Sequence, residues 1–432
     1  MEQRLLIKGV EALLPGGQVA KTDIAVEGAK IKSMGEPDPA WHPDRIIDGT
    51  DKFAIPGFVN AHTHAAMTLF RSFADDMPLM DWLRNKIWPA EANLTGDDVY
   101  WGTIAAIAEM LSSGTTTFAD MYFFMDKTAQ AVVDTGIRAV LSRGMAGVAP
   151  NAEQAISEAE SLFCDWHGAG EGRLTVMLGP HAPYTCPPPY LKRVVALAQK
   201  LGAEIHIHLA ETASEVRDCL ANYGKPPILL MDEVGILDCG VLAAHCVHVS
   251  PEETELLRKK QVRIAHNPGS NMKLASGIAP IPSLLAADIT VGLGTDGAAS
   301  NNNLDMLEEL RLAALLHKAA SGDAEAVPAV TAVNMATSGG ATAVGLGGIV
   351  GSLAPGFRAD ICLFDMRKPH WHPRHDRLSL LTYAAQAADT YLVMVDGKVL
   401  YENGCFTTID EERLYYEIET RSGRLTGFSA RK

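Results

Sequence analysis

Two histidines one residue apart end an apolar run in the stretch AIPGFVNAHTHAAM, residues 54–67. If this run is a β-strand, its side chains alternate between faces. His62 and His64 would then point to the same side, with Cα atoms about 6.5–7 Å apart. Two imidazoles placed in this way can bind one metal ion. The pair alone is weak evidence, because an ordinary strand can also end in two unrelated polar residues.

Other residues of metal-binding type stand at or just after the ends of three further apolar runs. These residues are His208, Glu211, His245 and Asp296. In a barrel of parallel strands the carboxyl ends of all strands meet at one mouth, which would bring these side chains together. Chance would rarely place residues of this kind at four strand ends. The set therefore predicts one site.

Three neutral imidazoles and one carboxylate form a ligand set that Zn2+ or a similar first-row metal accepts, with one position left for water. The ligands that we assign are His62, His64, His208 and Asp296. We expect one divalent metal per subunit, with zinc preferred. Glu211 is not needed as a ligand, and a carboxylate beside an activated water can instead carry a proton to the substrate.

Other histidines compete for these roles. His206 also forms an H-x-H pattern with His208, but it would lie deeper in the barrel, which favours a core position or a position behind a ligand. The cluster HWHPRH contains His370, His372 and His375. It looks more like a metal motif than any other stretch, yet it follows a β-rich piece outside the expected barrel. We interpret it as a solvated loop.

The residues with this chemistry belong to a regular alternation of apolar runs and helical patterns, which is typical of β-α units around a parallel sheet. The runs begin at residues 58, 115, 137, 173, 203, 241, 262 and 290. Capping-box patterns mark helix starts at Thr95 with Asp98 and at Ser250 with Glu253. Eight units in about 240 residues predict an α/β protein with a (β/α)8 TIM barrel.

The two ends of the chain share a different pattern. Residues 1–56 contain short β-rich pieces between Gly, Pro and Asp turn signals. Residues 354–432 contain similar pieces, including YLVMVDGKVLYENG with its Asp-Gly hairpin signal, and then a tail. We expect both ends to form one small β-sandwich domain beside a metal-dependent barrel of residues 57–353.

Composition excludes several classes of partner. The chain of 432 residues has 37 basic and 52 acidic side chains, a formal charge of −15 and no run of Lys and Arg, which argues against a nucleic-acid partner. The seven cysteines are odd in number and form no C-x-x-C pair, which predicts reduced thiols in a cytoplasmic protein. We recognise no signal peptide or membrane span and expect no membrane partner.

The ordered motifs of the chain resemble the amidohydrolase superfamily, and most closely its 5-methylthioadenosine/S-adenosylhomocysteine deaminase family. The motifs are PGFVNAHTHAAMTLFRS, GPHAPYTC, HIHLAET, AAHCVH, HNPGSNMKLASG and GLGTDGAASNNNLDM. Guanine deaminases and chlorotriazine hydrolases share any single motif, so both stay open as alternatives. A barrel that serves only as an interaction scaffold is the non-enzymatic alternative, and it predicts gaps in the ligand set.

The resemblance implies a hydrolase that acts on the C–N bond of a cyclic amidine. The implied reaction is the metal-dependent hydrolytic deamination of the adenine ring in 5'-modified adenosines, which yields the inosine analogue and ammonia. It implies the four metal ligands assigned above, with Glu211, His245 and Asp296 as catalytic residues. Asp296 would accept a proton from water and Glu211 would protonate N1, so both also contact the substrate, while His245 would orient the nucleophile. Binuclear members of the superfamily commonly use a carboxylated lysine at the fourth strand, but here that run ends GPHAPY with no lysine, so we expect one metal.

The resemblance also implies contacts to the rest of a nucleoside. Glu91 in WPAEANLT matches an acidic residue that accepts the ribose hydroxyls, and Arg143 and His181 match further substrate contacts. Family members that use S-adenosylhomocysteine have a second arginine shortly after the third strand, but residues 144–160 contain neither Arg nor Lys. We therefore favour 5'-methylthioadenosine, with S-adenosylhomocysteine and adenosine as alternatives, and we expect a homo-oligomer.

Overall fold

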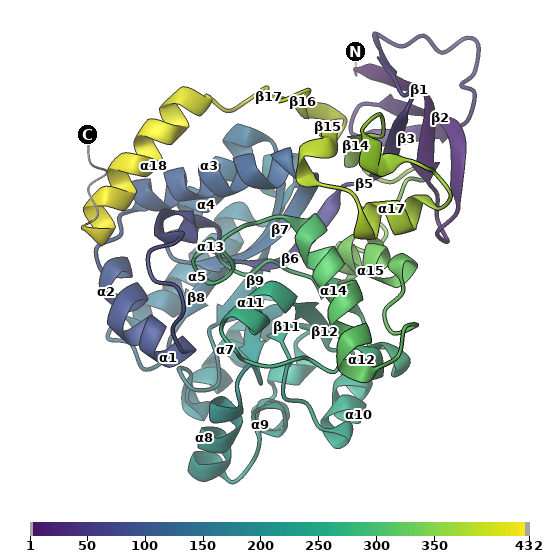
Figure 1. Ribbon diagram of the computed structural model, residues 1–432. Helices are drawn as coiled ribbons and strands as arrows, with labels where there is room; N and C mark the ends of the chain where they lie inside the picture. Colours follow the sequence, from purple (N-terminus) through teal and green to yellow (C-terminus); the bar gives the residue numbers. More distant parts are fainter. Residues whose placement is uncertain (1–2, 428–432) are drawn as a thin grey trace.

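A computed structural model describes residues 3–427, and its central feature is a sheet of eight parallel strands (Figure 1). The strands are β6 (Phe58–Thr63), β7 (Thr115–Tyr122), β8 (Arg138–Met145), β9 (Leu174–Pro180), β10 (Ile205–Leu209), β11 (Val241–His245), β12 (Arg263–His266) and β13 (Val291–Leu293). They are hydrogen-bonded in chain order from β6 to β13. Each strand overlaps one of the eight apolar runs, so the predicted barrel is confirmed.

The barrel closes between β6 and the residues just after β13. The backbone N–H of Asp296 donates to the carbonyl of His62 at 2.9 Å. The Asn60 side chain donates to the Thr295 hydroxyl at 2.7 Å and accepts from the Thr295 backbone at 3.0 Å. Gly294 permits this approach, because a Cβ there would lie only 2.8 Å from the His62 backbone nitrogen. The closure thus places Asp296 beside His62.

Helices surround the strands, as Figure 1 shows. The longer ones after the first four strands are α3 (Gly96–Ser112), α4 (Met125–Thr135), α5 (Ala152–Trp166) and α7 (Pro188–Leu201). Those after the last four are α8 (Ala213–Tyr223), α10 (Pro251–Lys259) and α14 (Met306–Ser321). Both capping boxes are present, at the starts of α3 and α10. Between β6 and α3 the chain also forms short helical pieces, including α1 (Leu79–Trp82) and α2 (Trp88–Glu91).

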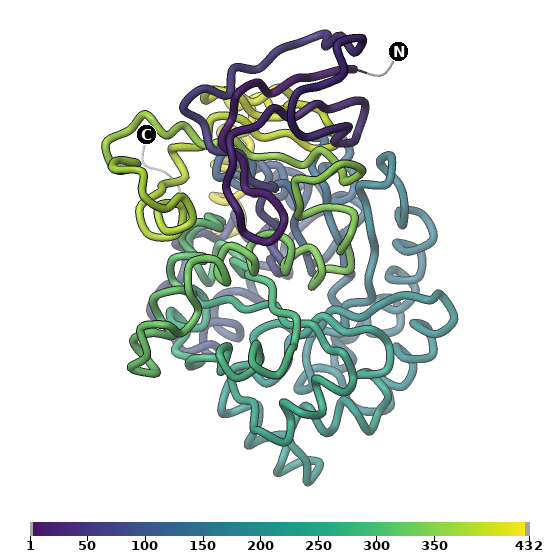
Figure 2. The backbone as a smooth tube through the Cα atoms, turned by 90° about the vertical axis from the view of Figure 1, so that its right-hand side faces the viewer, coloured from purple at the N-terminus to yellow at the C-terminus, as the bar shows by residue number. Residues whose placement is uncertain are grey.

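Both chain ends form a second, mixed sheet. Its amino-terminal strands are β1 (Arg4–Leu13), β2 (Val19–Glu27), β3 (Lys30–Met34), β4 (Arg45–Asp48) and β5 (Lys52–Pro56). Its carboxyl-terminal strands are β14 (Ile361–Asp365), β15 (Thr390–Val395), β16 (Lys398–Glu402) and β17 (Cys405–Phe406). The sheet order is β17-β16-β15-β14-β5-β1-β2-β3, and β4 pairs with β1. Figure 2 shows the purple amino-terminal strands beside the yellow-green carboxyl-terminal ones.

The antiparallel pairing of β5 with β14 joins the two ends of the chain and confirms one β-domain built from both. The predicted hairpin joins β15 and β16, with Asp396 and Gly397 at φ values of 48° and 74°. The exact boundaries at residues 56/57 and 353/354 stay a prediction. After the hairpin the chain returns to the barrel as α18 (Glu411–Thr426), where Arg421 donates to Asp98 of α3 at 3.0 Å.

Two expectations concern the chain as a whole. The seven cysteines all lie among the described residues and are free thiols, as their number and spacing predict. Within residues 3–427, no helix combines the length and the apolar character needed to cross a membrane.

A buried ion-pair network joins the barrel to the β-domain. Arg138, at the start of β8, donates from Nε to Asp360 at 2.8 Å and from Nη2 to Asp396. The three side chains are almost fully buried. Loss of one partner in such a network leaves uncompensated charge in the interior.

We predict that Arg138→Met lowers the free energy of unfolding by about 3–5 kcal/mol, because two buried carboxylates lose their cation. Urea denaturation measures this change. Arg358→Met is the matched control, since Arg358 is half-buried and lies 3.5 Å from Asp396. Its expected effect is below about 1 kcal/mol. Equal denaturation midpoints for the wild type and Arg138→Met would contradict the prediction.

Candidate metal and substrate site

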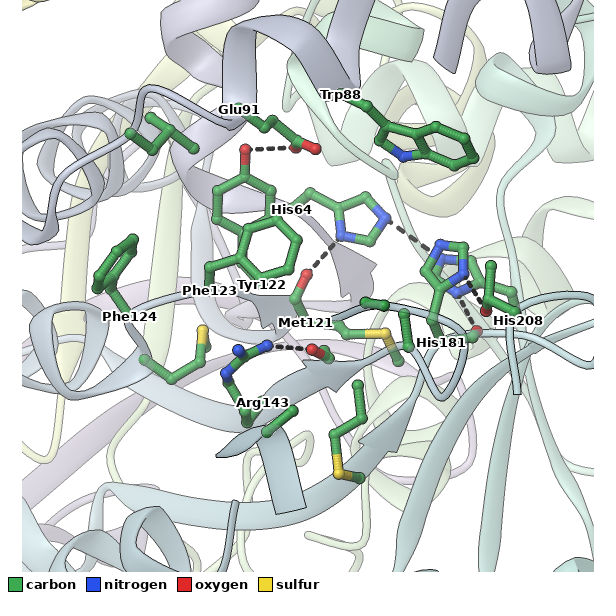
Figure 3. A pocket seen from close by; sticks show the side chains of 18 of the residues that line it. His64, Trp88, Glu91, Met121, Tyr122, Phe123, Phe124, Arg143, His181 and His208 are labelled. Carbon is green, nitrogen blue, oxygen red and sulfur yellow. Dashed lines mark hydrogen bonds between the residues drawn. The ribbon is translucent and has the colours of Figure 1, made fainter. Parts of the chain in front are cut away.

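A cavity of about 990 Å³ opens at the carboxyl ends of the barrel strands. It is within the size range of small-molecule sites in proteins. Its lining includes five of the proposed catalytic and metal-binding residues, namely His64, His208, Glu211, His245 and Asp296. The loop after β6 and helix α5 supply much of the wall. Figure 3 shows this cavity from close by.

Two of the proposed histidine ligands lie beside one carboxylate oxygen, and the third lies beside one of these histidines. The Oδ1 atom of Asp296 is 3.5 Å from His62 Nε2 and 3.3 Å from His64 Nε2. His208 Nε2 lies 3.2 Å from His64 Nε2. His245 also offers a nitrogen within 4.8 Å of ligand atoms from His62 and His208. The structure therefore brings all four assigned ligands together, with His245 at the edge of the same cluster.

Backbone carbonyls orient two of the imidazoles. His64 Nδ1 lies 2.6 Å from the Met121 carbonyl, and His208 Nδ1 lies 2.7 Å from the His181 carbonyl. A carbonyl only accepts, so each Nδ1 carries the proton and each Nε2 directs a lone pair toward the cluster. This is the tautomer that a metal ligand needs.

His62 is fully buried, and its Nε2 has no hydrogen-bond partner among residues 3–427. Its Nδ1 lies 2.8 Å from His206 Nε2. His206 therefore contacts a proposed ligand on the side away from the cluster, which agrees with the expected position behind a ligand. Burial lowers the pKa of His62 to about 4, which keeps the imidazole neutral at pH 7. The donor set consists of the unpartnered Nε2 of His62, the Nε2 lone pairs of His64 and His208, and the carboxylate of Asp296. This set fits a divalent cation.

Glu211 and His245 face each other, with Oε2 of Glu211 4.0 Å from Nε2 of His245. Burial raises the pKa of Glu211 above its usual value. Burial lowers the pKa of His245, but the facing Glu211 carboxylate and Asp296 more than offset this and raise it. A carboxyl group with a raised pKa facing an imidazole is an arrangement that suits general acid–base chemistry.

The backbone is strained where two of these side chains leave their strands. His245 has a φ of 74° and Asp296 a φ of 59°, the left-handed region that non-glycine residues rarely adopt. Such strain costs on the order of 1–3 kcal/mol per residue and is concentrated at functional sites. Here it turns both side chains toward the mouth of the barrel.

The segment 267–276, after β12, forms a hydrogen bond with each proposed catalytic residue. The pairs are Ser270 Oγ with Asp296 Oδ2 at 2.6 Å, Asn271 Oδ1 with His245 Nδ1 at 2.8 Å, and Ser276 Oγ with Glu211 Oε1 at 3.0 Å. The sequence reasoning did not identify these positioning residues. All three lie in the motif HNPGSNMKLASG, but no spacing rule connects them to partners on other strands.

Glu91 lies at the end of α2 and lines the cavity wall. Its Oε1 accepts a hydrogen bond from the Tyr122 hydroxyl at 2.6 Å, as Figure 3 shows. Burial raises the pKa of Glu91 to about 7, although the Tyr122 hydrogen bond opposes this rise. Glu91 is therefore a helical residue in the cavity rather than a carboxylate on a solvated loop.

The other two expected substrate contacts also line the cavity. Arg143, near the end of β8, donates from Nε to Glu158 at 2.7 Å. His181, directly after β9, places Nδ1 2.9 Å from the Thr185 hydroxyl. The ring centroids of His181 and His208 are 4.9 Å apart, which connects this part of the wall to the imidazole cluster.

The HWHPRH cluster lies outside the cavity. His372 and His375 are exposed, in agreement with a solvated loop. His370 differs from that expectation, because it is half-buried and its Nε2 lies 2.7 Å from Asp389 Oδ2. The adjacent Trp371 is fully buried and donates to the same carboxylate at 3.0 Å. This stretch therefore anchors the chain near β15.

Comparisons with known proteins place this barrel and its histidine cluster in a family of metal-dependent hydrolases. Residues 53–400 match the amidohydrolase family. A 5-methylthioadenosine/S-adenosylhomocysteine deaminase from Pelotomaculum thermopropionicum is 53% identical over 427 residues, which cover 98% of each chain. An adenosine deaminase from Xanthomonas campestris, solved with bound zinc, is 35% identical with a TM-score of 0.95 and coverage of 98% of this chain and 99% of that one.

A more distant solved structure is an atrazine chlorohydrolase from Arthrobacter aurescens complexed with zinc. It is 26% identical, with a TM-score of 0.91 and coverage of 97% of this chain and 100% of that one. The match over residues 53–400 and the high identity along nearly the whole chain confirm the resemblance seen in the motifs. The chain belongs to the amidohydrolase family and, within it, to the family of 5-methylthioadenosine/S-adenosylhomocysteine deaminases.

Proposed function

We propose that this protein is a metal-dependent deaminase that converts 5'-modified adenosines to the inosine analogue and ammonia. The observation that carries the proposal is the convergence of four possible ligands and two proton-transfer groups on one cavity. The deaminase that is 53% identical supports the reaction class. No member of the expected ligand set is missing, which argues against a scaffold that has lost activity.

We assign the metal to one zinc ion per subunit, held by His62, His64, His208 and Asp296. The zinc present in the 35% identical structural neighbour supports this choice. When bound, the cation supplies a Lewis acid that lowers the pKa of a water molecule toward about 7. The tautomers of His64 and His208 present unprotonated nitrogens for that role.

The side chains then move the protons. Asp296, held by Ser270, accepts a proton from water as the oxygen attacks C6 of the adenine. Glu211, held by Ser276, gives its proton to N1. His245, held by Asn271, directs Nε2 toward the attacking oxygen. Asp296 passes its proton to the amino group, which leaves as ammonia, and Glu211 regains a proton from the C6 hydroxyl as the carbonyl forms.

Glu91, Arg143 and His181 are proposed to contact the rest of the nucleoside, with Glu91 on the ribose hydroxyls. We favour 5'-methylthioadenosine as the substrate, since residues 144–160 lack a basic side chain for a second charged group. A homo-oligomer and a cytoplasmic location remain expectations.

We predict that Glu91→Gln raises KM for 5'-methylthioadenosine about 10- to 100-fold, because an ionised acceptor for the ribose hydroxyls is lost. The change in kcat should stay below about threefold if ribose binding is equal in the ground and transition states. The pKa of about 7 means that Glu91 is ionised above and neutral below this pH. In the wild type, kcat/KM should therefore fall toward acid pH with an apparent pKa near 7.

Steady-state kinetics from pH 5.5 to 9 measure both effects, with Tyr122→Phe as the matched variant. Removing the Tyr122 hydroxyl takes away the hydrogen bond that lowers the Glu91 pKa, so the acid limb should move to higher pH. The Glu91→Gln variant should lack the limb. An unchanged KM in Glu91→Gln would remove Glu91 from the binding site.

Ammonia release by metal-replete protein tests the function itself. The substrates are 5'-methylthioadenosine, S-adenosylhomocysteine, adenosine and guanine, with chloride release from a chlorotriazine measured in parallel. We expect the highest kcat/KM with 5'-methylthioadenosine and no turnover of guanine or the triazine. Turnover of either of these without deamination of any adenosine would contradict the proposal.

A further inference from the structure

We propose that Glu158 determines which 5'-substituents the site accepts. Its carboxylate binds the Arg143 guanidinium, so Arg143 is less available to a substrate carboxylate and the site favours adenosines whose 5'-group carries none. This inference rests on the proposed deaminase function. It concerns the end of the cavity that lies away from His64 and His208 in Figure 3, where Arg143 is labelled.

Arg143 is the only Lys or Arg side chain that lines the cavity among residues 3–427. It is only 6% exposed. The carboxyl groups that line the same cavity are Glu91, Asp126, Glu158, Asp165, Glu211 and Asp296. A cavity with this balance of charge attracts cations and disfavours an additional anion. A substrate carboxylate could therefore find its counter-ion only at Arg143.

Two of the three guanidinium nitrogens of Arg143 already donate hydrogen bonds. Its Nε donates to Glu158 Oε2 at 2.7 Å, and its Nη1 donates to the Gly144 carbonyl. The guanidinium packs over the ring of Phe123, 5.2 Å from the centroid. Gln154 holds the other oxygen of Glu158 with a hydrogen bond at 2.7 Å. Arginine binds a carboxylate best through two parallel N–H donors. In Arg143, one of these donors, Nε–H, is already bound to the Glu158 carboxylate.

The surroundings of this pair suit an apolar or cationic group. Phe123 packs against Arg143, and Phe124, Val148 and Trp166 also line the cavity. They offer apolar surface to an alkylthio chain. Asp165 also lines the cavity and makes no hydrogen bond or ion pair within the described part of the chain. Its negative charge adds to the general repulsion that a substrate carboxylate would meet in this cavity.

The carboxylate can be isolated by a pair of substrates. S-Adenosylhomocysteine carries an ammonium and a carboxylate, and 5'-(3-aminopropylthio)adenosine lacks only the carboxylate. With wild-type protein, we expect kcat/KM for the aminopropyl compound and for 5'-methylthioadenosine to exceed that for S-adenosylhomocysteine by at least about tenfold. Equal values for the two matched compounds would overturn the inference.

The variants E158Q and E158A test the residue directly. Releasing Arg143 should raise kcat/KM for S-adenosylhomocysteine relative to 5'-methylthioadenosine about 10- to 100-fold, the usual range for a hydrogen bond between charged groups. The Glu158 side chain is 40% exposed, and E158Q keeps its shape, so both variants should fold. Thermal unfolding checks this.

Two control variants separate the contact with Arg143 from the general loss of negative charge. D165N removes one charge from the same cavity without touching Arg143, and the substrate ratio should change less than about threefold. E160Q removes a charge on the same helix that pairs with Lys200, outside the cavity, and should leave the ratio unchanged. A shift in D165N as large as that in E158Q would overturn the specific role of Glu158.

The same assay separates the two proposals. If no adenosine releases ammonia, the deaminase function fails and the inference fails with it. If ammonia is released but the substrate ratio is the same in the wild type, E158Q and E158A, only the role of Glu158 is wrong.

Discussion

Replacing Glu211 by Gln is expected to lower kcat for 5'-methylthioadenosine about 1,000-fold, within the range of general acid–base catalysis. Glutamine keeps the size of the side chain and can still accept from Ser276, which lies 3.0 Å from Oε1. It cannot deliver a proton to N1. Because Glu211 is not one of the proposed ligands, the metal content of the variant should equal that of the wild type, and KM should change little.

Ser276→Ala is the matched control for Glu211. It keeps the carboxyl group and removes only the hydrogen bond that orients it, so kcat should fall about tenfold. Loss of this hydrogen bond should also raise the pKa of Glu211 further and move the pH profile of kcat to higher pH. Near-normal kcat in metal-replete Glu211→Gln would show that another group carries the proton.

Asp296→Asn should reduce kcat at saturating zinc by about 1,000-fold or more, because the proposed proton acceptor for the attacking water is lost. The substitution also removes the carboxylate charge beside His62 and His64. Zinc affinity should therefore fall as well. Equilibrium dialysis against zinc measures affinity, and single-turnover ammonia release at saturating zinc measures the chemical step.

The control for Asp296 is Ser270→Ala. This variant keeps the carboxylate and removes only the 2.6 Å hydrogen bond to Oδ2. Its kcat should fall less than about 30-fold, with zinc affinity within about tenfold of the wild type. Wild-type activity in zinc-saturated Asp296→Asn would exclude Asp296 as the proton acceptor.

Much of the fold was predictable because it depends on local pattern. The runs FVNAH, IRAVLSR and TVGLGTD each coincide with most or all of a barrel strand, and the helix starts at Thr95 and Ser250 have the predicted capping boxes. The site was predictable in part for the same reason. Once strands are identified, the barrel gathers their carboxyl ends, so His64, His208 and Asp296 meet without further information.

The contacts behind the site were not predictable, because they depend on how segments pack across the barrel. Ser270 reaches Asp296, 26 residues further along the chain, and Ser276 reaches Glu211, 65 residues earlier. The Arg143–Glu158 pair depends on how α5 lies over β8. The His370–Asp389 pair likewise needs the fold of the β-domain, so the histidine pattern alone suggested only a loop.

The most direct test of the account is a zinc titration of metal-free protein, with ammonia release from 5'-methylthioadenosine measured at each point. Removal of the metal should abolish activity, since the nucleophile at neutral pH depends on the cation. Activity should then rise in proportion to added zinc and reach its plateau at one equivalent per subunit. Undiminished turnover by the metal-free protein, or a plateau at two equivalents, would contradict the single-metal site.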